Sequence, residues 1–355
     1  MVRMFVWPFF VLFISLQPMF VSVLAQDSYT LTVGPGESIQ AAIDIAPQGA
    51  TIYLARGTWT ENVIITKTVT LQGAGEDLTV LHGKVDNQPV LEIRGDTPIT
   101  VTVQSLRVTG SSCEGGIRVS GWATLVLSDS AVVSNTYYGI GIFNPAQASI
   151  TRCIISGNTG YGIMVGYTPT APLNPDAVIS ISDCTITNNN AFIPSQETPV
   201  AGHGVWLFGS ASVRIANCTI SYNLHGLLSR NLGPVDIEGC EISSNYSLGI
   251  IVTTPIAGTA VSKVVLKHSK IISNSTGGIL LTGKVEAMIE ANQILRNGRY
   301  GVFLGERPCV NVDEVFTGSI VGRGNTIAWN ELADVCPQEL AFLMTLWGGE
   351  LDRRK

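Results

Sequence analysis

Four side chains that could bind a metal ion or move a proton lie within eight residues of one another: Cys218, Tyr222, Asn223 and His225. Thiolate and imidazole groups are common ligands of transition metals, and imidazole and phenol groups serve as general acids and bases. The segment is therefore either a reactive site or part of a recurring structural unit. A return of the same residue types at the same spacing would favour the structural unit.

The cysteine and the asparagine of this segment belong to a sequence repeat. Its pattern is Cys, Ser or Asn, then Ile or Val two positions later, then Asn three positions after that. A weaker additional copy begins at Leu106, and consecutive full copies begin 22 to 34 residues apart, a spacing typical of stacked repeats. The eight full copies begin at Ser130, Cys153, Cys184, Cys218, Cys240, Ser269, Asn292 and Asn325.

Two short apolar segments accompany each copy and predict strands rather than helices. Apolar residues alternate just before the repeat, as at Ile179 and Ile181, which is typical of a strand with one buried face. A glycine after the Asn usually opens a second apolar segment, such as GIMVG at 162–166. Such a unit cannot bury its apolar face alone, so neighbouring units must stack. We therefore predict an all-β fold, a right-handed parallel β-helix of about eleven coils.

Stacking of coils converts the repeated positions into internal rows. Free cysteine is a small buried hydrophobe, and metal sites of the Cys-x-x-Cys type are absent from the sequence. We therefore predict a structural ladder of four cysteines: Cys153, Cys184, Cys218 and Cys240. Asparagine tolerates the left-handed backbone conformation, and its amide can bond to its neighbours in the stack. A second ladder of turn residues is therefore predicted at Asn158, Asn189, Asn223 and Asn245.

The two ends of the chain differ from the repeats. Residues 1–25 combine Arg3, a long apolar stretch and small residues before Gln26, which predicts an export signal; a retained membrane anchor is the alternative. Residues 37–46 place apolar side chains on one helical face and predict a capping helix. We expect one β-helix domain over 26–340, a C-terminal cap and tail over 341–355, and no membrane span after signal removal. A secreted or periplasmic location follows from the export signal.

The front of the domain carries a family resemblance. Residues 37–75 read ESIQAAIDIAPQGATIYLARGTWTENVIITKTVTLQGAG and resemble the opening of secreted right-handed β-helix proteins of the pectin-lyase-like superfamily. The later copies resemble the β-helix repeats of that group and of periplasmic copper-processing proteins. This resemblance implies the fold and leaves the activity open, because one fold hosts many functions.

Catalytic motifs of such enzymes are matched only in part. The Asp-containing segments of pectin methylesterases are absent, whereas Asn174-Pro175-Asp176 and Gly202-His203-Gly204 partly match the motifs of polygalacturonase-like hydrolases. An enzyme interpretation, as a polysaccharide lyase or hydrolase, would therefore use His203, Asp176 and Arg230. Calcium would accompany a lyase, but no cluster of carboxylates supports it, so no metal or cofactor is predicted.

The strand that follows the turn glycine offers a binding surface instead. Its second residue should point outward, yet it is mostly apolar along the repeats: Gly141, Met164, Trp206, Leu228, Ile251, Leu280 and Phe303. Either inserted loops or the C-terminal segment cover this strip, or it forms an open groove for a sugar chain. In the second case Trp206 and Phe303 would be stacking platforms. Three tyrosines that directly precede the glycine would border the strip: Tyr138, Tyr161 and Tyr300.

The remaining reactive residues receive simpler interpretations. Cys309 and Cys336 lie outside the ladder and are candidates for a disulfide in an exported chain. The histidines His82, His225 and His268 occupy separate coils, so we interpret them as isolated surface or turn residues. The net charge is −6 without a basic run, which disfavours nucleic acid as a partner.

Together these features predict a secreted or envelope protein that binds a polysaccharide, a cell-surface glycan or another surface molecule without catalysis. The first alternative is a polysaccharide lyase or hydrolase with a divergent site. The second is a periplasmic accessory protein for metal maturation, which rests on the resemblance of the repeats alone.

Overall fold

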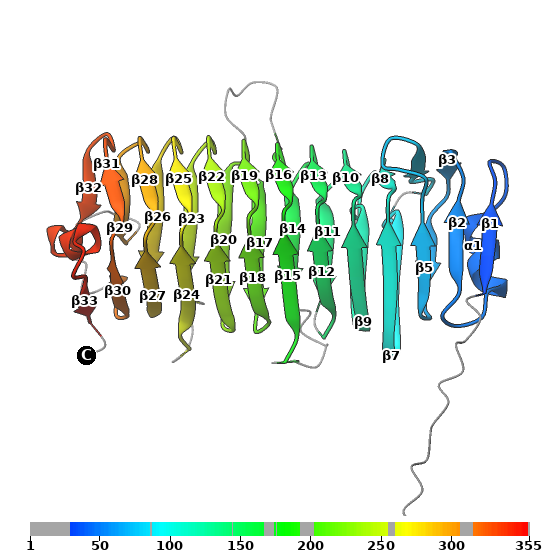
Figure 1. Ribbon diagram of the computed structural model, residues 1–355, viewed down its shortest axis with the longest axis horizontal. Helices are drawn as coiled ribbons and strands as arrows, with labels where there is room; N and C mark the ends of the chain where they lie inside the picture. Colours follow the sequence, from blue (N-terminus) through cyan, green and yellow to red (C-terminus); the bar gives the residue numbers. More distant parts are fainter. Residues whose placement is uncertain are drawn as a thin grey trace, which may run out of the picture.

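A computed structural model describes residues 29–353 apart from 86, 144, 167–173, 175, 192–201, 255–259 and 306–314. The predicted export signal therefore lies outside the described residues. The chain winds into a solenoid whose coils follow one another along the long axis of the molecule (Figure 1). A complete coil contributes one strand to each of three faces, and equivalent strands of successive coils pair in parallel.

The first face begins each full coil. It consists of β4 (Val63–Ile65), the first parts of β7 (Leu91–Gln104) and β9 (Ile117–Ser128), β11 (Tyr138–Phe143), β14 (Tyr161–Gly166), β17 (His203–Gly209), β20 (His225–Asn231), β23 (Leu248–Thr253), β26 (Gly277–Thr282), β29 (Tyr300–Leu304) and β32 (Ala333–Cys336). Long strands β7 and β9 continue onto the second face, so the two faces form one sheet.

The second face contains β1 (Thr30–Val33), β2 (Thr51–Leu54), β5 (Val69–Gln72), the later parts of β7 and β9, β12 (Gln147–Thr151), β15 (Val178–Ser182), β18 (Ser212–Ala216), β21 (Pro234–Glu238), β24 (Ser262–Lys267), β27 (Val285–Glu290), β30 (Ser319–Arg323) and β33 (Gly349–Asp352). The strand β33 pairs with β30 in the antiparallel direction, in contrast to the parallel pairs of the coils.

The third face is a separate sheet of short strands: β3 (Gly57–Thr60), β6 (Thr79–His82), β8 (Arg107–Thr109), β10 (Ala131–Val133), β13 (Ile154–Ser156), β16 (Thr185–Thr187), β19 (Thr219–Ser221), β22 (Glu241–Ser243), β25 (Lys270–Ile272), β28 (Gln293–Leu295) and β31 (Thr326–Ala328). Within the described residues this sheet has eleven strands, which agrees with the number of coils predicted from the repeats.

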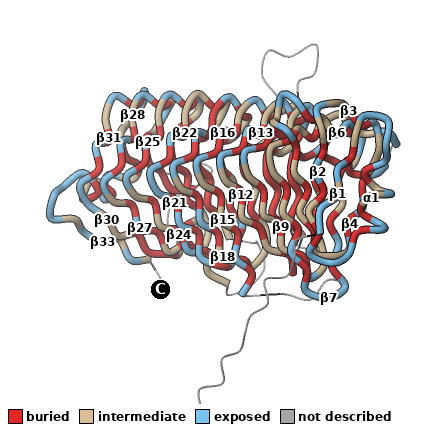
Figure 2. The backbone as a smooth tube through the Cα atoms, turned by 45° about the vertical axis from the view of Figure 1, so that its right-hand side comes forward, coloured by how far each residue is buried: buried red, intermediate tan, exposed pale blue. Residues whose placement is uncertain are grey.

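The core fills the inside of the solenoid from one end to the other. Alternation places one side of every strand inward, so that Ile179 and Ile181 of β15 are buried while Val178 is exposed. Buried residues accordingly follow the inner wall of the coils, and exposed residues concentrate at the corners and ends (Figure 2). The predicted all-β right-handed β-helix is confirmed.

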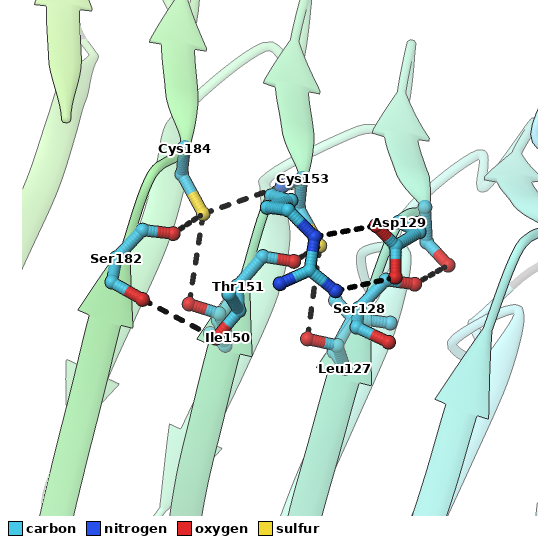
Figure 3. Close-up of polar contacts among 10 residues, drawn as sticks. Leu127, Ser128, Asp129, Ile150, Thr151, Cys153, Ser182 and Cys184 are labelled. Atoms are coloured by element: carbon cyan, nitrogen blue, oxygen red, sulfur yellow. Dashed lines mark hydrogen bonds and ion pairs between the residues drawn. The ribbon is translucent and has the colours of Figure 1, made fainter. Parts of the chain in front are cut away.

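The cysteine ladder is confirmed as a buried row of free thiols. The backbone N–H of Cys153 donates to Sγ of Cys184 at 3.4 Å, and the Cys184 thiol donates to the carbonyl of Ser182 at 3.1 Å (Figure 3). The residue before each ladder position forms a corner of the coil, and Arg152 at one such corner has φ 53°. Its guanidinium donates two hydrogen bonds, of 2.7 and 2.8 Å, to the carboxylate of Asp129 in the preceding coil. Such exposed pairs keep register rather than perform chemistry.

The asparagine ladder is also confirmed, with one correction. The left-handed residue is not the asparagine but the one before it, such as Tyr222 with φ 55°. That corner turns the asparagine inward, where Asn189 donates both its backbone N–H and Nδ2 to Oδ1 of Asn223. The same pair of bonds recurs between successive coils up to Asn330, whose N–H and Nδ2 donate to Oδ1 of Asp334.

Both ends of the solenoid are capped. The helix α1 (Ile39–Ile45) lies within the predicted range; Ser38 caps it, and Ile39 and Ile43 are buried against the first coils. At the other end the 3-10 helix η1 (Gln338–Met344) buries Leu340 and Leu343. Within the described residues, neither helix is long and apolar enough to cross a membrane.

Candidate functional site

The outward side of the first face carries two columns of aligned residues. The first column holds the residue before each strand glycine, and the second column is the apolar strip predicted from the sequence. We call the two columns together the outer strip. The first column runs Tyr138, Tyr161, His203, His225, Leu248, Gly277 and Tyr300, and the second runs Gly141, Met164, Trp206, Leu228, Ile251, Leu280, Phe303 and Cys336.

The C-terminal half of the outer strip is a second apolar cluster. Leu248, Ile251, Leu280, Phe303 and Cys336 are all buried and form a cluster separate from the main core. The expectation of an open apolar groove is wrong for this half, because Phe303 is only 4% exposed and offers no ring face to a ligand. The strip is therefore shielded from solvent in this half.

The structure describes one of the two cysteines that were predicted to form a disulfide. Cys336, within this second cluster, is disulfide-bonded. Its predicted partner Cys309 lies outside the described residues. Cys113, for which the sequence suggested no role, is an exposed free cysteine.

The middle of the strip, from Tyr161 to His225, carries aromatic rings that are only partly covered. Tyr161 stacks on Trp206 with ring centroids 4.6 Å apart and ring planes 28° apart. Trp206 lies in turn 6.4 Å from Phe208, in a similarly stacked orientation. The ring centroid of His203 is 5.4 Å from that of Tyr161 and 5.1 Å from that of His225. The two histidine rings are also stacked. We call these five residues the aromatic cluster; all of them are half-buried.

The two histidines of the aromatic cluster are held neutral. Burial is the main cause that lowers the pKa of His203 from 6.5 to about 3, with smaller contributions from His225 and Arg230. Burial also lowers the pKa of His225 to about 4. The backbone N–H of Leu248 donates to Nδ1 of His225 at 3.1 Å, so the proton of the neutral ring is on Nε2. This tautomer leaves His225 without a free lone pair for a metal ion.

The three residues proposed for catalysis are not all brought together. His203 opens β17, and Arg230 of β20 is exposed and pairs in register with Phe208. Asp176 lies instead in an exposed turn before β15, where its N–H donates to Oδ1 of Asn174. Asp176 and His203 therefore lie near opposite ends of the first-face strands.

Two of the three tyrosines predicted to border the strip differ in environment from Trp206. Tyr138 is 1% exposed, although its ring is close to those of Tyr137 and Phe143. Tyr300 is half-buried and packs on Phe303 with the second apolar cluster. Tyr161 and Trp206 are therefore the members of the predicted set that meet as a partly open surface.

His225 is the member of the aromatic cluster that sequence reasoning misinterpreted. It is not isolated, because it stacks on His203. The signal was present: both histidines directly precede a strand glycine, the slot already recognised for the tyrosines. Within the described ranges, no group of three or more His, Cys, Asp or Glu residues is arranged to hold a metal ion.

Together the coils, ladders and capped ends define a right-handed parallel β-helix protein. A family model described as "Right handed beta helix region" matches residues 92–173 and 172–327, and the chain belongs to this family. A search of curated proteins gives no match.

Solved structures share the fold at low sequence identity. ORF18 of Geobacillus virus E2 is 13% identical with a TM-score of 0.60, over 83% of this chain and 57% of the viral chain, so this chain spans little more than half of that protein. An alginate lyase from Paenibacillus sp. str. FPU-7 is 16% identical with a TM-score of 0.58, over 74% and 94% of the two chains. The catalytic domain of a GH87 alpha-1,3-glucanase in complex with nigerose is 14% identical with a TM-score of 0.53, over 88% and 66%.

Proposed function

We propose that this protein binds a polysaccharide on the aromatic cluster and does not cleave it. The observation that carries the proposal is the stacked pair of Tyr161 and Trp206, which is half-buried on the outside of a regular sheet. Flat aromatic surfaces of this kind suit the apolar faces of sugar rings, while their polar tips remain available for hydroxyl groups. Two solved structures of the same fold are an alginate lyase and an alpha-1,3-glucanase, which is consistent with a polysaccharide ligand.

The protonation of the cluster favours binding over acid–base catalysis. An effective general base has a pKa near the working pH. Burial instead lowers the pKa of His203 to about 3 and the pKa of His225 to about 4. Burial also raises the pKa of Tyr161, which keeps its hydroxyl protonated. These groups therefore act as neutral hydrogen-bonding and stacking partners at physiological pH.

The disulfide-bonded state of Cys336 supports a location in an oxidising compartment. We accordingly propose that the protein acts outside the cytoplasm, at the cell surface or in the periplasm, where polysaccharides are available.

Calorimetric titration of the purified chain with oligomers of alginate, polygalacturonate and α-1,3-glucan tests the proposal. We expect at least one of them to bind, and Trp206→Ala to weaken that binding by about tenfold or more, since stacking interactions of this size are typical of aromatic platforms. Trp329→Ala is the matched control, because Trp329 is 70% exposed at a corner beside the last coil. Equal binding by the wild-type protein and Trp206→Ala would refute the proposed surface.

The same oligomers separate binding from the enzyme alternative. Product release that is abolished by His203→Ala would establish a lyase or hydrolase and reject the non-catalytic role. We expect the oligomers to be recovered intact after prolonged incubation.

A further inference from the structure

The aromatic cluster continues onto the preceding coil through Tyr137, which lies at the corner before β11 and is 46% exposed. Its ring centroid is 5.8 Å from that of Tyr161 in the next coil, and the two ring planes are 69° apart. Tyr137 therefore adds a second aromatic surface at an angle to the stacked pair of Tyr161 and Trp206. Because nearly half of this residue is open to solvent, a ligand can reach it.

Tyr137 is the first member of a continuous series of four rings. Next comes Tyr161, then Trp206 with its ring centroid 4.6 Å from that of Tyr161, and then Phe208 at 6.4 Å from Trp206. We call these four residues the ring row. Tyr137 precedes β11, whereas Phe208 lies near the end of β17, two coils farther along the solenoid. Since coils are about 4.8 Å apart, the ring row extends roughly 10 Å along the axis while it crosses the first face obliquely.

The backbone conformation of Tyr137 is an unfavourable one for a tyrosine. Its φ is 71°, in the left-handed region that glycine and asparagine adopt more readily than bulky residues do. Other corners of the solenoid hold Gly157 and Asn188 in this region. The turn at Tyr137 would therefore accept a residue with less strain and does not itself require an aromatic side chain. Strained residues cluster at functional sites, which directs attention to the Tyr137 ring.

The neighbouring coils hold Tyr137 in place. Its N–H donates to Oγ1 of Thr159 at 3.1 Å, and its carbonyl accepts the N–H of Tyr161 at 2.7 Å. A Cβ atom at Gly160 would overlap this carbonyl oxygen, so the close approach of the two coils requires glycine there. The Tyr137 ring also packs against buried Tyr138, with ring centroids 5.2 Å apart. A side chain restrained in this way loses little conformational entropy when a ligand binds.

We propose that Tyr137 is a further sugar-binding residue and that one glycan chain crosses the first face obliquely, from Tyr137 to Phe208. The inference rests on the proposed polysaccharide-binding function and extends it to the path of the chain. The side chains of the ring row are aromatic and uncharged, so they suit the apolar faces of sugar rings. Because the ring row covers three coils, it fits a chain of several sugar units better than a single sugar.

Calorimetry with hexasaccharides of mannuronate, galacturonate and α-1,3-linked glucose tests this path. Tyr137→Asn should weaken the tightest of these complexes by about fivefold, the effect of one lost aromatic contact. Tyr137→Phe keeps the ring and should retain the wild-type affinity within about twofold. Arg299→Asn is the matched control, because Arg299 also directly precedes a strand tyrosine, has φ 47° and lies outside the ring row. We expect this control to bind as the wild-type chain does.

Thermal unfolding of the same variants separates a binding role from a structural one. Asparagine tolerates the left-handed conformation, so Tyr137→Asn and Arg299→Asn should both unfold within about 2 °C of the wild-type chain or at a higher temperature. A lower unfolding temperature of Tyr137→Asn with unchanged affinity would show a structural role and overturn the inference.

Two further outcomes separate this inference from the proposed function. If Trp206→Ala weakens binding of a hexasaccharide and Tyr137→Asn does not, the oblique path is wrong while polysaccharide binding stands. An equal loss of affinity in Tyr137→Phe and Tyr137→Asn would also overturn the inference, because the ring would then contribute nothing. Failure of all three hexasaccharides to bind the wild-type chain would instead reject the proposed function itself.

Discussion

The two halves of the outer strip share one backbone and one register but have different environments. From β23 to β32 the strip is a buried apolar cluster of Leu248, Ile251, Leu280, Phe303 and Cys336. From β14 to β20 the equivalent positions hold buried Met164, half-buried Leu228 and four half-buried rings, and the two histidines among these rings are held neutral. The asparagine ladder continues unchanged through both halves, whereas the cysteine slot is taken over by Ser269, Asn292 and Asn325 in the C-terminal half. The coil therefore specifies the fold, while the outward columns are free to specify either a second core or a binding surface.

The largest expected effect lies in the C-terminal half. Phe303→Ala should reduce the free energy of unfolding by about 3–5 kcal/mol, because it removes a buried aromatic ring and leaves a cavity. Urea denaturation measures this loss. Oligosaccharide affinity, measured in parallel, should be unchanged, and a variant of full stability would contradict the assignment of Phe303 to a second core.

The next effect belongs to the two histidines and depends on pH. Both have folded-state pKa values below the ordinary 6.5, at about 3 and about 4. The unfolded chain therefore takes up protons at higher pH than the folded chain does. Their stabilising contribution is complete above pH 6.5 and is lost as the pH falls toward 4. We expect a loss of about 2 kcal/mol per histidine between pH 7 and pH 5.

Urea denaturation at these two pH values checks the histidine prediction. His203→Gln should remove part of the pH dependence, since glutamine cannot be protonated. His268→Gln is the control, because His268 is mostly exposed and lies outside the aromatic cluster. A slope that is identical in all three proteins would contradict the assigned burial.

Leu228 marks the boundary between the two halves and should show a smaller, mixed effect. It pairs in register with Trp206 on one side and Ile251 on the other, and it packs against the second cluster. Leu228→Ser should reduce the free energy of unfolding by about 1 kcal/mol, because the side chain is only half-buried. It should also weaken oligosaccharide binding by less than Trp206→Ala does. A variant that changes stability alone would assign Leu228 to the second apolar cluster. A variant that changes binding alone would assign it to the aromatic cluster.

The smallest effect is expected inside the solenoid, at the slot that holds cysteine in one half and serine or asparagine in the other. Serine already occupies the cysteine slot at Ser269, which accepts the N–H of Cys240 and donates to the carbonyl of Lys267. Cys218→Ser should therefore cost about 1 kcal/mol or less. Cys218→Leu should cost more through overpacking, about 1–3 kcal/mol. A large loss for the serine variant would indicate that the thiol itself has a further role.

The fold could be predicted because its determinants are local and repeated. The spacing from Cys218 to Asn223 recurs in every full copy, and each slot has one structural solution in a stack. The corner residue escaped prediction, since left-handed φ falls on residues as different as Tyr222 and Arg152 and leaves no common residue type.

The candidate site was less predictable for a physical reason. Exposure of an outward residue depends on its surroundings in the folded molecule, and the segments between copies vary in length, since copies begin 22 to 34 residues apart. Phe303 and Trp206 occupy the same column, yet one is buried and the other half-buried.

The asparagine ladder also has a direction. Every link, from Asn135 onward, donates from one coil to Oδ1 of the next coil toward the C-terminus. The amide dipoles therefore add along the axis, and each bond polarises the next. The positive end of this row would be exposed at the last coil, but Asp334 accepts from Asn330 there with a carboxylate. The stack is thus terminated electrostatically as well as sterically, and a further coil could be added only by replacing that charge with another amide.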